Sequence, residues 1–260
     1  MTDRPDYDSF TDFEASRNRV ADAMARQVLA TCAPWLTRPV AELDVLDIGS
    51  GYGRTAMELS RRCRRVVALE PAQHLHTRAV ASAAAEEHGD LEHRHGGVEE
   101  LTDVAAFDLV VLDNVYEHLP DHRVALQRIA AALRPGGVAF VLVPNKAWPI
   151  EAHYRLPFLA WLPLRWADRY LRWSGRGTSY QDASYAPTYR SLRRDVGRQP
   201  DLTAHFVLPH DPTATVAGTP VHYRWGMAAL RRWPALWAVS KALLVVLVKE
   251  PADSPTPPGR

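Results

Sequence analysis

The sequence predicts an α/β fold with a doubly wound, mostly parallel sheet of seven strands in the Rossmann-like arrangement. Three observations support it. A short apolar strand ends in a glycine-rich turn and a helix, and the next strand ends in an acid. Strand-like and helix-like segments then alternate along the chain, which is typical of a parallel sheet covered on both faces.

The glycine-rich turn follows a buried strand at 45–48. Gly49, Gly51 and Gly53 allow a sharp turn and a close approach of the backbone to a ligand. A helix is expected at 54–62, so its N-terminus would face that ligand. Such a turn suits many nucleotide-like ligands and does not identify one.

The second strand is expected at 65–70, and Glu70 closes it. The distance along the chain from the glycine turn to this acid is close to the roughly 20 residues typical of a ribose-binding carboxylate. We therefore predict that Glu70 binds ribose hydroxyl groups; an exposed surface glutamate is the alternative.

The remaining elements are assigned from apolar periodicity and from glycine and proline breaks. Strands are expected at 91–95, 107–113, 138–143, 204–208 and 242–248, and helices at 13–36 (over the cofactor end), 71–88, 120–133, 188–197 and 227–238, with 209–226 irregular. His74, His76 and His88 are expected to be solvated. Ligands of such sheets bind beyond the carboxyl ends of the strands.

Residues 146–186 are rich in aromatic residues, proline and arginine, and they are too many for a plain loop. We predict a single domain over 1–260 with an inserted lid or substrate-binding segment at 146–186. Its arginines and tryptophans suit a phosphate-bearing substrate or an anionic membrane surface. Ordinary solvated helix faces are an equal alternative.

Composition excludes some classes of function. The net charge of +1 indicates no nucleic-acid partner. Cys32 and Cys63 are too few for a disulfide framework, and the polar N-terminus is unlike a signal peptide, so a cytoplasmic location is predicted. Peripheral membrane contact is predicted if 233–248 is partly exposed; burial of that region is the simpler alternative.

Taken together, four motifs resemble those of the class I S-adenosylmethionine-dependent methyltransferases over roughly residues 40–145. They are the glycine turn 45–53, Glu70, the segment 107–119 and the Leu-Arg-Pro-Gly-Gly turn at 133–137. Arg54 stands where a dinucleotide-binding fingerprint has its third glycine.

This resemblance implies S-adenosylmethionine as the cofactor and assigns roles by position. Asp47, Gly49, Ser50, Gly51 and Gly53 would hold its methionine part, with Asp113 and Asn114 on the same side.

The adenosine part would lie against Glu70, Pro71 and Val98. Many relatives have an acid at the position of Gly97, so Glu99 or the backbone is expected to take over its contact with the adenine amine.

His118 is the leading candidate for a catalytic base, because it follows the fourth strand where cofactor and acceptor would meet. Alternatively, Glu117 and His118 only shape the pocket. Glu151 and His153 form a second candidate pair in the insertion. By resemblance to quinone-biosynthesis O-methyltransferases, Asn114, Glu117 and His118 would be metal positions, but asparagine is a weak ligand there and no metal is predicted.

The sequence thus predicts a methyltransferase acting on a small-molecule or lipid-linked acceptor, with oxygen as the atom expected to be methylated. A non-catalytic S-adenosylmethionine-binding subunit and a nicotinamide-dependent oxidoreductase are the alternatives. The acceptor and the oligomeric state stay open.

Overall fold

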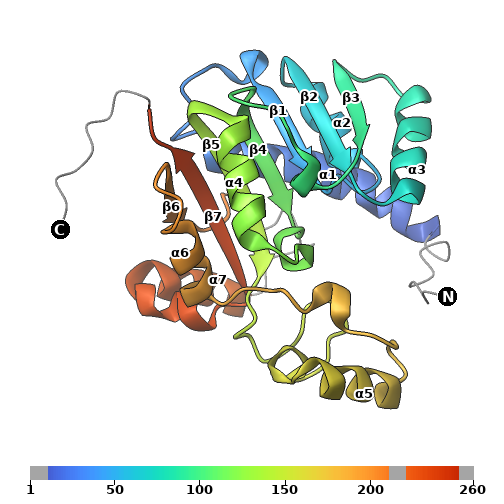
Figure 1. The fold of residues 1–260 in the computed structure, drawn as a ribbon, viewed down its shortest axis with the longest axis vertical. Coiled ribbons are helices and arrows are strands. Elements are labelled where there is room, and N and C mark those ends of the chain that lie inside the picture. The colour runs from blue at the N-terminus through green and yellow to red at the C-terminus, as the bar shows by residue number, and fades with distance from the viewer. Residues whose placement is uncertain (1–10, 211–220, 252–260) are drawn as a thin grey trace.

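The computed structural model describes residues 11–210 and 221–251, without the side chains of 11–19 and 221–224. Its centre is one sheet of seven strands in the order β3-β2-β1-β4-β5-β7-β6 (Figure 1). The strands are β1 (Asp44–Ile48), β2 (Arg65–Glu70), β3 (Leu91–His95), β4 (Phe107–Asp113), β5 (Leu133–Pro144), β6 (Leu202–Phe206) and β7 (Ala242–Lys249). The predicted fold class is confirmed.

Strands β1 to β5 pair in parallel, and only β7 runs antiparallel to its neighbours β5 and β6. The chain leaves β1 toward β2 and β3 on one side and later returns to β4 and β5 on the other. The order therefore reverses between β1 and β4, and a ligand crevice is expected at their carboxyl ends.

Helices cover both faces of the sheet (Figure 1). The α-helices are α1 (Thr11–Cys32), α2 (Arg54–Ser60), α3 (Gln73–Ala84), α4 (His122–Ala132), α5 (Leu164–Ser174), α6 (Tyr189–Val196) and α7 (Val221–Arg232), and the 3-10 helices are η2 (Val40–Glu42), η3 (Val98–Glu100), η4 (Tyr116–His118), η5 (Leu159–Trp161), η6 (Gln181–Ala183) and η7 (Pro234–Val239). One core joins α1 and α2 to the sheet through Val28 and Leu59, and the other joins α4 and α6 through Ile129 and Leu192.

Some sequence-based predictions differ from the structure. Helix α7 begins at Val221, inside the range expected to be irregular, and ends before Pro234, which starts η7. Residues 211–220 of that range lie outside the described residues. His76 is not solvated: both ring nitrogens are buried without a hydrogen-bond partner, beside the rings of His93 and His95.

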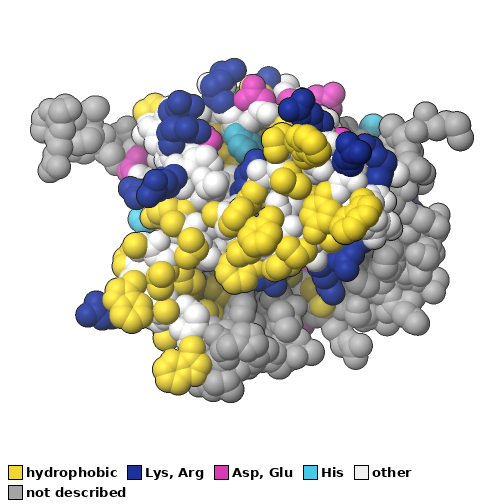
Figure 2. All heavy atoms as spheres, turned by 90° about the horizontal axis from the view of Figure 1, so that it is seen from below, with side chains coloured by type: hydrophobic (Ala, Val, Ile, Leu, Met, Phe, Trp, Pro, Cys, Tyr) yellow, Lys and Arg dark blue, Asp and Glu magenta, His cyan; other side chains and the backbone are white. Residues whose placement is uncertain are grey.

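The insertion between β5 and α6 folds around a small core of its own, and it lies at the lower end of the molecule in Figure 1. Buried Leu159 of η5 and buried Ala167 and Leu171 of α5 belong to this core. The lower face carries many hydrophobic side chains (Figure 2). The role of the insertion as a lid stays a prediction.

Strand β5 begins earlier than predicted, at Leu133, directly after α4. Its register against β4 shifts after Leu133, so the following Arg-Pro-Gly-Gly residues bulge out of the ladder. The bulge directs Arg134 toward two buried carboxylates, with 2.7 Å from Nη2 to Asp44 Oδ2 and 2.7 Å from Nη1 to Asp108 Oδ2. Asp108 Oδ2 also accepts the backbone N–H of Asp44 at 2.8 Å.

Replacing Arg134 by methionine should destabilise the protein by about 1–3 kcal/mol. The value lies below the usual cost of breaking a buried ion pair, because the arginine is partly exposed and Arg38 and Arg64 also reach these acids. Urea unfolding followed by tryptophan fluorescence measures the change. Arg123→Met on an exposed face is the control, and equal stability of the two variants would contradict the role of the bulge.

Candidate active site

A cavity of about 230 Å³ opens at the carboxyl ends of β1 and β4. The glycine turn and the ends of both strands line it, and α1 covers one side, as predicted for a helix over the cofactor end. The lining residues are Val20, Ala21, Met24, Asp47, Gly49, Ser50, Gly51, Tyr52, Arg54, Thr55 and Asp113.

The glycine turn has the backbone geometry that its sequence predicts. Gly49, Gly51 and Gly53 all have positive φ, at 68°, 58° and 70°. A Cβ at Gly49 would lie 2.6 Å from a methyl carbon of Val115, whereas a Cβ at Gly51 would meet open space. Gly49 therefore permits tight packing against the segment after β4, while Gly51 leaves backbone bare toward the cavity.

Two carboxylates at this cavity, the buried Asp47 and the partly buried Asp113, lie in surroundings that disfavour their charge. Burial, reinforced by the charges of Asp113 and Glu70, raises the pKa of Asp47 to about 8. Burial also raises the pKa of Asp113 to about 6, against the opposing hydrogen bond from Asn114. No Lys or Arg among the described residues forms an ion pair with either. A cationic ligand would supply the missing positive charge.

Glu70 is buried at the end of β2 and ties the glycine turn to the next loop. Its Oε2 accepts the N–H of Gly51 at 2.7 Å, and its Oε1 accepts the N–H of Ala72 at 2.8 Å. A carboxylate has about four acceptor positions, so two remain for hydroxyl groups. This geometry is compatible with the predicted ribose contact.

The expected adenine side lies at η3. Val98 is buried and Pro71 is exposed. A Cβ at Gly97 would lie 2.3 Å from Oε1 of Glu99, so the carboxylate of Glu99 occupies the space of a side chain at position 97. This placement favours Glu99 as the substitute for the acid that is absent there.

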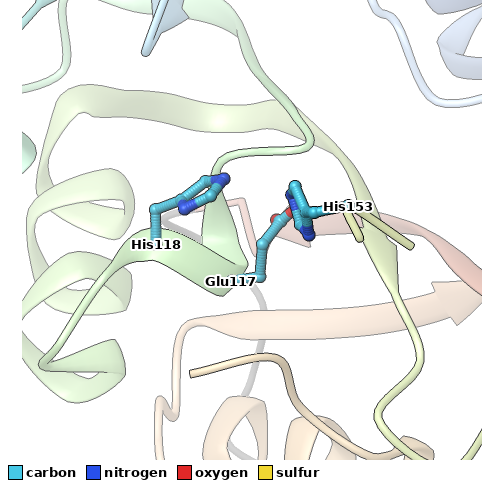
Figure 3. A group of neighbouring side chains, drawn as sticks. All are labelled: Glu117, His118 and His153. Atoms are coloured by element: carbon cyan, nitrogen blue, oxygen red, sulfur yellow. The ribbon is translucent and has the colours of Figure 1, made fainter. Parts of the chain in front are cut away.

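A second group of polar side chains lies just beyond, where η4 meets the insertion. Glu117 and His118 come from η4 and His153 from the insertion, and the three point toward one another (Figure 3). One potential ligand atom of each lies within 4.8 Å of the other two. The structure thus joins two candidate pairs that the sequence analysis treated separately.

Each histidine of this group is oriented by a partner behind it. Nδ1 of His118 donates to the carbonyl oxygen of Asp182 at 2.7 Å, and Nδ1 of His153 donates to Oε1 of Glu151 at 2.8 Å. Glu151 also accepts the N–H of Tyr154. In its neutral form each imidazole therefore keeps the lone pair of Nε2 for a ligand, and Nε2 of His153 lies 3.8 Å from Oε1 of Glu117.

The surroundings of the three residues shift their pKa values in different directions. Glu117 is fully buried, both its oxygens lack a hydrogen-bond partner, and burial raises its pKa to about 7. Burial also lowers the pKa of His118. For His153 the effect of burial is outweighed by the hydrogen bond to Glu151 and the charges of Glu151 and Glu117, so its pKa is raised.

Asn114 does not lie where the resemblance to metal-binding relatives would place it. Asn114 has a positive φ of 53°, and its side chain donates to Asp113 Oδ1 at 2.8 Å, so it does not join the group of Glu117, His118 and His153. Asp182 and Val115 are not among the site residues predicted from the sequence. Asp182 contributes only a backbone oxygen, for which residue type gives no signal.

Comparison with known proteins identifies the cofactor and the family. A family model described as a methyltransferase domain matches residues 17–195. The ubiquinone biosynthesis O-methyltransferase of Bradyrhizobium diazoefficiens is 35% identical over 136 residues, which are 52% of this chain and 50% of that protein. Its namesake in Rhizobium leguminosarum is 29% identical, covering 75% of this chain and 70% of that protein. The chain spans about half the length of the first of these relatives.

Solved structures share the fold at low identity. An S-adenosylmethionine-dependent methyltransferase from Mesorhizobium loti matches with a TM-score of 0.56 and 15% identity, over 85% of this chain and 98% of that one. The N-methyltransferase NodS from Bradyrhizobium japonicum, in complex with S-adenosyl-L-homocysteine, matches with a TM-score of 0.50 and 15% identity, over 90% of this chain and 86% of that one. The predicted cofactor, S-adenosylmethionine, is confirmed, and the comparisons give no support to the two alternatives.

The raised pKa of Asp47 predicts an unusual pH dependence of stability without cofactor. The folded protein retains a proton on Asp47 that the unfolded chain loses above pH 3.8, so this contribution is full at low pH and is lost as the pH rises toward 8. The free energy of unfolding of Asp47→Asn minus that of wild type should therefore be higher at pH 8.5 than at pH 5.5, by up to about 3 kcal/mol. Urea midpoints at both pH values measure it.

Asp90→Asn, at an exposed position, is the control for that comparison. A stability difference between wild type and Asp47→Asn that stays constant with pH would contradict the assignment. Saturating S-adenosylmethionine should remove the loss in wild type alone, because the cation stabilises the ionised carboxylate.

Glu70→Ala should weaken S-adenosylmethionine binding by about 1–3 kcal/mol, because ribose hydroxyls and the N–H of Gly51 both lose an acceptor. Glu70→Gln separates the two effects, since its amide oxygen can still accept one hydrogen bond. Calorimetric titration gives the affinities, and Glu87→Ala at an exposed position serves as the control. Unchanged affinity in Glu70→Ala would refute the ribose contact.

Proposed function

The chain belongs to the S-adenosylmethionine-dependent methyltransferase family, and we propose that it transfers the methyl group to an oxygen atom of a small-molecule or lipid-linked acceptor. The observation that carries this proposal is the group of Glu117, His118 and His153 beside the cofactor cavity. These side chains can bind and deprotonate a hydroxyl group, and the relatives named as O-methyltransferases support the same chemistry.

The cofactor side of the reaction needs little from the protein beyond binding and alignment. The sulfonium already activates the methyl group, so the protein must place a nucleophile in line with it and exclude water. The buried carboxylates of Asp47 and Asp113 are suited to the positively charged methionine part of the cofactor. The bare backbone at Gly51 allows close approach.

The acceptor side needs removal of a proton from an attacking hydroxyl. The lowered pKa of His118 keeps its imidazole neutral near pH 7, and its hydrogen bond to Asp182 leaves Nε2 free to accept that proton. The raised pKa of His153 favours its protonated form, which can donate a hydrogen bond to a negatively charged acceptor oxygen. We assign His118 as the base and His153, held by Glu151, as its partner in binding the acceptor oxygen.

The same donor set fits a divalent metal ion. Glu117 provides a buried carboxylate without hydrogen-bond partners, and both histidines present an Nε2 lone pair while a carbonyl or carboxylate fixes Nδ1. Glu117, His118 and His153 would hold the ion, with His153 in place of the Asn114 of the sequence-based assignment. Such an ion would lower the pKa of an acceptor hydroxyl.

We further propose a cytoplasmic setting and a small acceptor rather than nucleic acid. Cys32 and Cys63 are both buried free thiols, which is compatible with a reducing compartment. The near-neutral net charge gives no general attraction to a polyanion. None of the described helices has both the length and the apolar character needed to cross a bilayer.

Substitution of the Glu–His–His group should separate turnover from cofactor binding. His118→Ala and His153→Ala should each lower kcat at least about 100-fold, the usual contribution of a positioned acid or base. The affinity for S-adenosylmethionine, measured by calorimetry, should change less than about twofold, because these residues lie on the acceptor side. A prenylated dihydroxybenzene serves as the test acceptor, and His88→Ala at an exposed position is the control.

The metal is tested separately by titrating chelator-treated protein with Mg²⁺, Mn²⁺ and Zn²⁺ in a calorimeter. Binding that is lost in Glu117→Gln supports the site. Absence of binding, with full turnover in chelator, would leave His118 as the base and refute the metal. Equal losses of turnover and cofactor affinity in the histidine variants would refute the catalytic assignment itself.

A further inference from the structure

The insertion exposes an unusual number of large hydrophobic side chains. Trp161 is 53% exposed, Trp166 50% and Trp173 84%. Ile150, Phe158 and Leu162 of the same segment are exposed as well. Single exposed hydrophobic residues are ordinary, but a contiguous set marks a surface that another phase or molecule covers.

Helix α5 carries two apolar stripes rather than one. Ala167 and Leu171 form the buried stripe over the core of the insertion. A second stripe, Trp166, Tyr170 and Trp173, recurs at helical spacing on the outer side of the helix and lines a shallow surface hollow together with Leu162 and Arg169. One stripe suffices for packing, so the second is available for an external partner.

The charges around the outward stripe are of one sign. Residues 146–180 contain six Lys and Arg against two acids, Glu151 and Asp168. Both acids are engaged within the fold, Glu151 with His153 and Asp168 with the backbone N–H of Tyr180 at 2.7 Å. In the described part of the chain, Arg165 and Arg169 form no ion pair with an acid. The surface therefore combines aromatic side chains with uncompensated positive charge.

A further helix lies at the same end of the molecule. In Figure 1 α7 and α5 both lie in the lower half of the molecule, α7 to the left and α5 to the right, and Figure 2 shows a broad hydrophobic area on this face with Lys and Arg side chains along its edges. Trp225 of α7 and Trp233 just after it are 72% and 57% exposed. The apolar area thus extends beyond the insertion.

We propose that this face, formed by 158–173 with α7, docks on the surface of an anionic lipid bilayer. Tryptophan and tyrosine favour the interface between headgroups and acyl chains, and arginines beside them pair with lipid phosphates. A second copy of this chain would bring the same arginines against these, and the acid of 158–173, Asp168, is already engaged with the backbone N–H of Tyr180.

The docking surface and the active site share one segment of chain. Residues 150–163 bring Glu151 and His153 to the acceptor side and Phe158, Trp161 and Leu162 to the surface. Nε1 of Trp161 donates to the carbonyl oxygen of Lys146 at 2.9 Å, which fixes this ring to the base of the insertion. An acceptor anchored in the bilayer would therefore enter on the His153 side; this last step rests on the proposed function.

Flotation with vesicles tests the surface without any acceptor. Wild type should bind vesicles of phosphatidylcholine with phosphatidylglycerol and bind pure phosphatidylcholine at least tenfold more weakly. Trp166→Glu/Trp173→Glu and Arg165→Glu/Arg169→Glu should each reduce binding to the anionic vesicles at least tenfold. The controls make the same kinds of change elsewhere: Val104→Glu, at a 74% exposed position, and Arg123→Glu.

Turnover of a soluble, tail-less acceptor should be the same in wild type and both double variants, which separates failure of docking from failure of the proposed reaction. Equal vesicle binding by wild type and the tryptophan variant overturns the proposal. So does equal binding to neutral and anionic vesicles. A wild-type dimer in sedimentation that the tryptophan variant dissociates, with no vesicle binding by either, assigns the face to a second copy and overturns it too.

Discussion

Carboxylates withdrawn from water without a Lys or Arg partner are the constraint on which this site depends. Asp47 is the next-to-last residue of β1, Asp113 ends β4 and Glu117 follows in η4, and within the described residues none of the three pairs with Lys or Arg. Burial raises the pKa of each, so ionising them costs folding free energy that only a bound cation returns. Elsewhere the chain does pair its buried acids, as Asp44 and Asp108 with Arg134 show.

Residues 113–118 connect the two halves of the site. Asp113 faces the cofactor cavity, Val115 packs against Gly49 of the glycine turn, and His118 belongs to the acceptor group. Between them, Tyr116 is fully buried and stacks on His122 with ring centroids 4.1 Å apart. Because one short and well-packed segment carries all these contacts, the positions of Glu117 and His118 relative to the cofactor cavity are fixed locally, whereas the position of His153 depends on the insertion.

The sequence predicts best what depends on local patterns. The glycine turn, the acid at the end of β2 and the alternation of strands and helices each follow from backbone conformation or apolar spacing, and the structure shows all of them. The proximity of Glu117 and His153 could not be predicted in this way, because the two residues are far apart in the chain. The hydrogen-bond partner of His118 could not be predicted either, because it is the backbone carbonyl of Asp182, a group that every residue has. Helix α7 started earlier than expected, since its first turn adjoins a range without apolar periodicity.

The insertion links the acceptor group to the outer surface through its own folding. Its two ends meet, because the N–H of Lys146 donates to the carbonyl oxygen of Pro187 at 2.9 Å, and its interior is the small core around Leu171. A compact loop with joined ends behaves as one unit. Any displacement about that base would carry His153 and the tryptophans of α5 together. If those tryptophans contact a bilayer, as proposed, that contact and the completion of the Glu–His–His group would therefore be coupled through the packing of the insertion.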